Sequence, residues 1–340
     1  MKRILLLLVG GTVCSSDSGN GVFSVSDKAG AALIENFRKS DSPFSETEFV
    51  LTENLFILSE NMTVDRWNDI YRVYKKYTDS DRFDGVIFAH GTDTLGYSAS
   101  LFSLLLSKAD IPVFFVSSNA VLTDSRANGN DNFKAAVECI CMGIEPNVYV
   151  CYKNISNGKM MLHLASRLKQ CENYSEDFKS VGETDISAIS PSVLEEIAKK
   201  FPRDKKIPIL LPENFALKGS VAMITPYVGI DYSAFELSRY RAVLHLSYHS
   251  GTACADGKKS GSLLFLADHF DGDIYFSPAK RCGGIYESAH RIANENKIGF
   301  LYGSTNELIY SKLVIAYSLF DRKEDIDNFL NTEFNFEKFC

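Results

Sequence analysis

Short aliphatic runs alternate with longer stretches of helical spacing through the first 142 residues of the chain. The aliphatic runs predict strands at residues 4–9, 48–51, 55–58, 85–89 and 113–116. The stretches between them predict helices at residues 29–39, 64–77, 97–108 and 130–142. Buried strands separated by helices are typical of parallel sheets, so this alternation predicts a doubly wound, mainly parallel α/β domain.

The pattern weakens over residues 152–212, where polar residues and prolines predict a hairpin followed by an interdomain connection. Strand-like runs return at residues 220–224, 242–246, 274–276 and 297–300. A chain of 340 residues has room for about two domains. We therefore expect a larger N-terminal domain over 1–185, a linker over 186–212, and a smaller, flavodoxin-like C-terminal α/β domain over 213–340.

Charge and cysteine usage narrow the possible partners. A net charge of −7 argues against nucleic acid or an anionic membrane, and no apolar run is long enough to cross a bilayer. The eight cysteines include no C-x-x-C pair, so we expect buried thiols in a reducing compartment, with no metal and no cofactor. Lys2 and Arg3 precede an apolar run that is too short for a secretory signal, which predicts a cytoplasmic protein.

Polar side chains follow the predicted strands at the points where they end. Thr12 follows Gly10-Gly11, Ser59 precedes Glu60, and Ser118 follows the run at 113–116. The run at 85–89 leads into His90-Gly91-Thr92-Asp93-Thr94. Helix capping explains some of these residues, but it leaves a hydroxyl and His90 unexplained. Because parallel sheets bind ligands at the carboxyl ends of their strands, we expect a small-molecule site for a zwitterion such as an amino acid.

These motifs resemble those of the L-asparaginase family, in particular its cytoplasmic bacterial type I branch. The resemblance covers most of the chain, and the His-Gly-Thr-Asp-Thr motif is its most specific part. The other matching segments are Gly10-Gly11-Thr12-Val13, Val116-Ser117-Ser118-Asn119, Arg126-Ala127-Asn128-Gly129, Ile224-Thr225-Pro226-Tyr227-Val228-Gly229-Ile230 and Ser247-Tyr248-His249-Ser250-Gly251-Thr252-Ala253.

The resemblance implies hydrolysis of asparagine to aspartate and ammonia by threonine-based acyl transfer, with Thr12 and Thr92 on opposite sides of the amide. It implies that Asp93 binds the substrate ammonium, that Ser59 binds its carboxylate, and that a lysine pairs with Thr92. Lys169 matches that lysine by its spacing to a following phenylalanine, and His163 is the rival position. The remaining expected substrate-binding residues are Gly11, Glu60, Gly91 and Ser118. We also expect backbone N–H groups of the glycine turns to stabilise the oxyanion.

The chain departs from the family pattern at Val22, where the family has a tyrosine that contacts the first threonine. This departure leaves open a weakened homologue that senses asparagine or aspartate, and an amidase or glutaminase for another amide. The segment Ser59-Glu60-Asn61-Met62 resembles that of the asparaginase-like subunit of archaeal Glu-tRNA(Gln) amidotransferase, which releases ammonia from glutamine. Cys282 matches a cysteine at the effector site of some type I enzymes, and an ordinary core thiol is the alternative interpretation. Family members form homodimers or homotetramers, so we expect a homo-oligomer.

Overall fold

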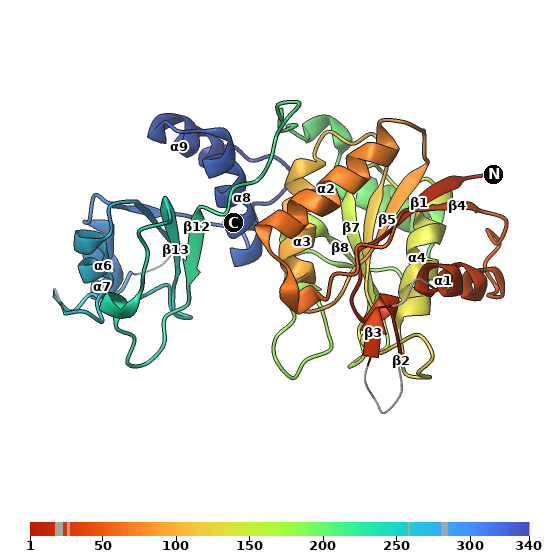
Figure 1. The fold of residues 1–340 in the computed structure, drawn as a ribbon, viewed down its shortest axis with the longest axis horizontal. Coiled ribbons are helices and arrows are strands. Elements are labelled where there is room, and N and C mark those ends of the chain that lie inside the picture. The colour runs from red at the N-terminus through yellow and green to blue at the C-terminus, as the bar shows by residue number, and fades with distance from the viewer. Residues whose placement is uncertain (18–22, 26–27, 258, 280–284, 340) are drawn as a thin grey trace. The chain divides into compact units, whose positions relative to one another are not determined.

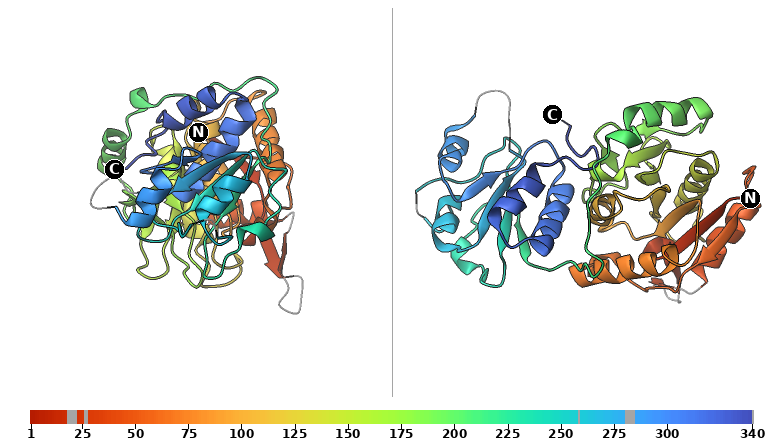
Figure 2. Two further views of the ribbon diagram at one scale, coloured as in Figure 1. Left: turned by 90° about the vertical axis from the view of Figure 1, so that its left-hand side faces the viewer. Right: turned by 90° about the horizontal axis from the view of Figure 1, so that it is seen from above.

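The computed structural model describes residues 1–17, 23–25, 28–257, 259–279 and 285–339 (Figure 1). These residues form two compact units. The first unit comprises Met1–Leu211 together with Phe334–Phe336, and the second comprises Pro212–Glu333 together with Glu337–Cys340. Each unit is built of helices around a sheet, so the predicted α/β class is confirmed (Figure 2).

The first unit is organised by a seven-stranded sheet in the order β11-β8-β7-β6-β5-β1-β4. The five strands from β7 to β4 run parallel, whereas β8 and β11 are antiparallel to their neighbours. Burial on both faces explains the aliphatic runs in the sequence, since each fully buried Leu or Ile contributes roughly 1.5–3 kcal/mol. The strands are β1 (Arg3–Leu8), β4 (Glu48–Leu51), β5 (Gly85–Ala89), β6 (Val113–Val116), β7 (Val148–Lys153), β8 (Met160–Leu164) and β11 (Thr184–Asp185).

Helices cover both faces of this sheet (Figure 1). On one face lie α2 (Val64–Thr78) and α3 (Leu95–Leu105), where Tyr74 and Phe102 stack around Phe88 of β5. On the other face lie α1 (Ala29–Arg38) and α4 (Gly129–Cys141), which meet through Phe37 and Phe133. The doubly wound arrangement predicted from the sequence is therefore present, with loops at the carboxyl ends of β1, β5 and β6 free to build a site.

Shorter elements complete the first unit. Two small hairpins are formed by β2 (Ser15–Asp17) with β3 (Phe23–Val25), and by β9 (Leu168–Lys169) with β10 (Lys179–Ser180). The segment expected to be a linker contains α5 (Pro191–Lys200), whose Leu194 and Ile197 belong to the core of this unit. The predicted strand at 55–58 is reduced to a single parallel bridge between Gly10 and Ile57.

The second unit contains a four-stranded parallel sheet in the order β12-β13-β14-β15. Its strands are β12 (Val221–Ile224), β13 (Ala242–Leu246), β14 (Asp273–Ser277) and β15 (Ile298–Phe300). Its helices are α6 (Leu263–His269), α7 (Glu287–Ala293), α8 (Asn306–Leu319) and α9 (Lys323–Asn331). None of the helices in the described parts of either unit is long and apolar enough to span a membrane.

Candidate active site

Three turns at the carboxyl edge of the large sheet pack against one another without room for a side chain between them. A Cβ atom added to Gly11, which has a φ of 75°, would lie 2.1 Å from the Cα of Gly91. A Cβ added to Gly91 would lie 2.4 Å from the Oγ of Ser59. The glycines in the two motifs are therefore needed for close approach, which brings the segments after β1 and β5 together with the 3₁₀ turn η2 (Ser59–Asn61).

This packing places the two threonines of the motifs at the same edge. Thr12 begins the 3₁₀ turn η1 (Thr12–Cys14) directly after Gly11, and Thr92 directly follows Gly91. Both residues are partly exposed. The N–H groups of Gly10 and Gly11 donate to Ala89 O and Ile57 O, so these two are already used and do not serve the expected oxyanion role.

Ser59, Asp93 and Thr94 form a hydrogen-bonded group beside these threonines. The buried Ser59 hydroxyl donates to Asp93 Oδ2 at 3.0 Å, and Thr94 Oγ1 donates to the carbonyl of Ser59 at 2.9 Å. Asp93 is exposed, as is Glu60, which lies next to Ser59. The structure thus brings the predicted pair Ser59 and Asp93 into direct contact, with a carboxylate facing solvent at the sheet edge.

Lys169 lies apart from this group. It ends the two-residue strand β9, its side chain is 57% exposed, and its ion-pair partner is Glu172 at 3.9 Å. Within the described residues, no hydrogen bond or ion pair joins Lys169 to Thr92. The rival position, His163, is fully buried on β8, where Nδ1 lies 2.9 Å from Ser180 Oγ.

Gln170 instead contacts the motif, and sequence reasoning missed it. Its Nε2 donates to the carbonyl of Thr92 at 2.9 Å, and its Oε1 accepts from the N–H of Gly96 at 2.8 Å. The sequence offered one signal for this contact, which is that Gln170 directly follows Lys169. Because adjacent residues of an extended chain point to opposite sides, the side of the chain that Lys169 does not face is the side that Gln170 faces.

A cavity of about 440 Å³ opens beside Thr92 and Asp93. Its wall is formed mainly by the loop between β9 and β10, and it contains Gln170, Glu172 and Glu176. Asn119 also lines it and donates from Nδ2 to Glu176 Oε2 at 3.1 Å. The cavity is large enough to hold an amino acid, and its described walls combine carboxylates, amides and a threonine.

Ser118 supports the loop instead of facing the cavity. Its hydroxyl donates to Ala120 O at 2.6 Å and accepts from the N–H of Gly129 at 3.1 Å. Asn119 and Asn128 exchange reciprocal bonds between backbone N–H and side-chain oxygen, each 3.0 Å long. Asn119 and Asn128 therefore form a reciprocal pair that closes this loop.

His90 lies under the motif and is completely buried. Its Nδ1 is 2.7 Å from Gly91 O, and its ring packs edge-on against Phe115. Burial lowers the pKa of His90 to about 4, so the imidazole is neutral near pH 7. We therefore interpret His90 as a residue that supports the motif, because a buried ring is not accessible to accept a proton from a substrate.

Two expected residues, Val22 and Cys282, lie outside the described residues. Across the described ranges, no group of three or more His, Cys, Asp or Glu side chains is arranged to hold a metal ion.

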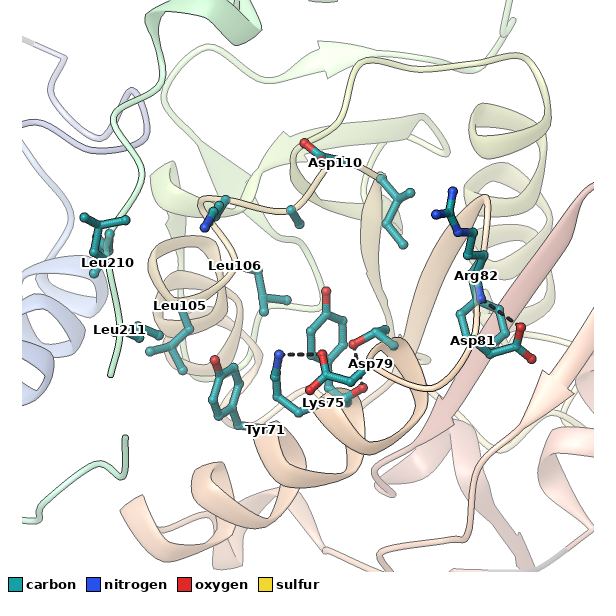
Figure 3. A pocket seen from close by; sticks show the side chains of 17 residues that line it. Tyr71, Lys75, Asp79, Asp81, Arg82, Leu105, Leu106, Asp110, Leu210 and Leu211 are labelled. Atoms are coloured by element: carbon teal, nitrogen blue, oxygen red, sulfur yellow. Dashed lines mark hydrogen bonds and ion pairs between the residues drawn. The ribbon is translucent and has the colours of Figure 1, made fainter. Parts of the chain in front are cut away.

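A larger cavity lies elsewhere in the first unit, at the amino ends of β5 and β6 (Figure 3). It measures about 750 Å³ and is lined by parts of α2 and α3 and by the loops before these strands. Lys75 and Asp79 form an ion pair at its wall, and Asp110 pairs with Arg203. It contains none of the motif residues, so the smaller cavity beside Thr92 is the better candidate for chemistry.

Comparison with known proteins agrees with the motifs. The family model described as "Asparaginase, N-terminal" matches residues 3–205. A subunit of the Glutamyl-tRNA(Gln) amidotransferase of Methanococcus maripaludis is 28% identical over 242 residues, covering 68% of this chain and 55% of the relative. The L-asparaginase of Thermococcus kodakarensis is 26% identical over 189 residues, covering 55% of this chain and 53% of the relative.

The chain thus spans about half the length of the curated relatives it matches. In three dimensions the likeness is wider. The structure of the thermostable L-asparaginase from Thermococcus kodakarensis superposes with a TM-score of 0.73 and 20% sequence identity, covering 99% of both chains. This likeness shows a shared two-domain fold.

Proposed function

Since the chain belongs to the asparaginase family, we propose that it hydrolyses the side-chain amide of L-asparagine to aspartate and ammonia. The observation that carries this proposal is the packing of Gly11, Gly91 and Ser59, which brings Thr12, Thr92 and Asp93 to one edge of the sheet. Thr92 and Asp93 line a cavity at that edge. Hydroxyls and a carboxylate at one edge are the groups needed to bind an amino acid and attack its amide.

In the proposed reaction, the substrate ammonium pairs with the exposed carboxylate of Asp93, and Ser59 helps to orient that carboxylate. A threonine hydroxyl adds to the amide carbon, its proton is transferred to the amide nitrogen, and the C–N bond breaks to release ammonia and leave an acyl ester. Water then hydrolyses the acyl ester to release aspartate and restore the hydroxyl. Gly11 and Gly91 contribute because their lack of a side chain lets the turns that carry Thr12, Thr92 and Ser59 pack closely. Glu60 lies next to Ser59 at the same edge.

The test is ammonia release from asparagine by the purified chain, alongside Thr12→Ala and Thr92→Val. Thr92→Val keeps the shape of the side chain and removes only the hydroxyl. We expect each variant to lose at least about a hundredfold in rate, because covalent catalysis needs the nucleophile and its partner together. Release that survives both substitutions would contradict the proposal.

A second candidate function is a catalytically weakened amino-acid sensor. The exposure of Lys169 favours it, because the described contacts place no lysine against Thr92 to activate a hydroxyl. Calorimetry distinguishes the two candidates. A sensor binds asparagine or aspartate with measurable heat and releases no ammonia, whereas an asparaginase releases ammonia from the same sample.

The ammonia assay is repeated with glutamine as the substrate, because a relative is named as an amidotransferase subunit. Faster ammonia release from glutamine than from asparagine would favour a glutaminase or amidotransferase role.

We also propose that the chain forms a homodimer or homotetramer. Light scattering on the same preparation checks its oligomeric state.

A further inference from the structure

Gln170 joins two backbone groups that lie on either side of the motif residues. Its side-chain amide donates to Thr92 O and accepts from Gly96 N, at 2.9 Å and 2.8 Å. A single planar amide therefore spans the segment that carries Thr92, Asp93 and Thr94.

The start of α3 explains why such a contact is needed. The first N–H groups of a helix have no partner within the helix and are usually satisfied by a capping side chain. Thr94 occupies the N-cap position but its side chain accepts no capping hydrogen bond, and its hydroxyl donates to Ser59 O. Gln170 supplies the missing acceptor to Gly96 from another part of the chain.

Close packing at the helix start supports the same contact. A Cβ added to Gly96 would lie 2.8 Å from both the Cα and the N of Gln170. The glycine thus admits the backbone of residue 170 right against the first turn of α3.

We propose that Gln170 is a positioning residue that sets the placement of Thr92 and Asp93 for amide hydrolysis. This inference rests on the function proposed above. Gln170 acts through the Thr92 carbonyl and the start of α3, while Thr94 contacts the turn that carries Ser59.

Gln170 is itself anchored through the residues that precede it. The 3₁₀ turn η3 (Ala165–Arg167) donates from Ser166 Oγ to Asn335 O at 2.6 Å and from Arg167 Nε to Phe336 O. Residues 334–336 belong to the same compact unit. The segment that ends in Gln170, which contacts Thr92, is therefore hydrogen-bonded to Asn335 and Phe336.

The sharpest variant is Gln170→Glu. An ionised glutamate still accepts from Gly96 N–H, but it has no proton to donate to Thr92 O. We expect ammonia release at pH 8 to fall about tenfold, equivalent to about 1.4 kcal/mol in the barrier. Protonation restores the donor, so the rate ratio of variant to wild type should rise as the pH falls towards 5. A ratio that does not change with pH, or no loss at pH 8, would overturn the proposal.

A second measurement does not depend on turnover. Hydrogen exchange in a peptide containing Gly96 is compared between wild type, Gln170→Met and Lys179→Gln, in the full chain. Lys179 is an exposed residue on the same hairpin and serves as the matched control. We expect at least tenfold faster exchange in Gln170→Met and no change in the control. Unchanged exchange in Gln170→Met refutes the role of Gln170, whereas a lack of ammonia from wild type refutes only the proposed activity.

Discussion

Gly91 is the residue on which the site geometry depends most directly. It has no positive φ, so backbone conformation does not require glycine there. The requirement is steric, because Ser59 Oγ occupies the space that a Cβ would need. Gly158, in the turn between β7 and β8, is the opposite case: its φ is 68°, and nothing lies within 4 Å of an added Cβ.

This contrast predicts different outcomes for two alanine variants. Gly91→Ala should lower the free energy of unfolding by roughly 1–3 kcal/mol through overpacking and should also reduce ammonia release. Gly158→Ala should cost about 1–2 kcal/mol through its left-handed backbone while leaving turnover intact. Urea titration and the ammonia assay measure both effects. Full activity in Gly91→Ala would show that the close approach to Ser59 is dispensable.

The short segment Phe334–Phe336 contributes to the first unit as though it were one of its own elements. Asn335 is fully buried, and its Nδ2 donates to Ser103 O at 3.1 Å and to Asn147 Oδ1 at 3.0 Å. Ile207 N–H also donates to Phe334 O. The segment therefore contacts α3, the loop before β7 and η3. Of these, α3 directly follows Thr94, and η3 lies shortly before Gln170.

We predict that Asn335→Ala destabilises the first unit by roughly 1–3 kcal/mol, because Ser103 O loses its side-chain donor and Asn147 Oδ1 keeps only the N–H of Val148. Asn328→Ala is the control, since Asn328 is exposed on α9. Urea titration should show a lower midpoint for Asn335→Ala and little change for Asn328→Ala. Equal midpoints for the two variants would mean that water satisfies the oxygens.

The sequence predicts some elements far better than others, for physical reasons. The strand β5 was predicted with its observed bounds, Gly85–Ala89, because a central parallel strand is buried on both faces and must be aliphatic. The orientation of β9 was not predictable. A strand of two residues has no periodicity, and a shift of one residue decides whether Lys169 or Gln170 faces Thr92.

The same difficulty affects the site. The glycine and threonine motifs were identified because each directly follows a strand, which is a local signal. The contacts of Gln170 come from a segment more than 70 positions away from Gly96, with no local pattern to mark them. Pairings of that kind are set by the packed fold, so the sequence did not reveal which side chain caps α3.

Buried histidines in both units make the stability of the whole chain depend on pH. Burial lowers the pKa of His90 and of His245 to about 4 and that of His163 to about 3. The carboxylate of Glu183, 3.5 Å from His163 Nδ1, favours the charged ring, but the burial outweighs it. Between pH 4 and the unfolded value of about 6.5, the unfolded chain binds more protons than the folded one.

The free energy of unfolding should therefore be highest above pH 6.5 and fall as the pH is lowered towards 4. Each histidine contributes at most about 1.4 kcal/mol per pH unit in this range. Urea titrations at pH 7, 6 and 5 measure the slope. His163→Gln should make the slope shallower, whereas His249→Gln, at an exposed position, should not. An identical slope in all three proteins would contradict this account.

The contribution of Phe334–Phe336 to the first unit has a consequence for how the chain is made. A nascent chain leaves the ribosome from its N-terminus, and domains usually fold as they emerge. Here Ser103, Asn147 and Ser166 have their hydrogen-bond partner at Asn335, which lies at least 169 positions later in the chain. Translation must therefore pass through Pro212–Glu333 before the last contacts of the first unit can form.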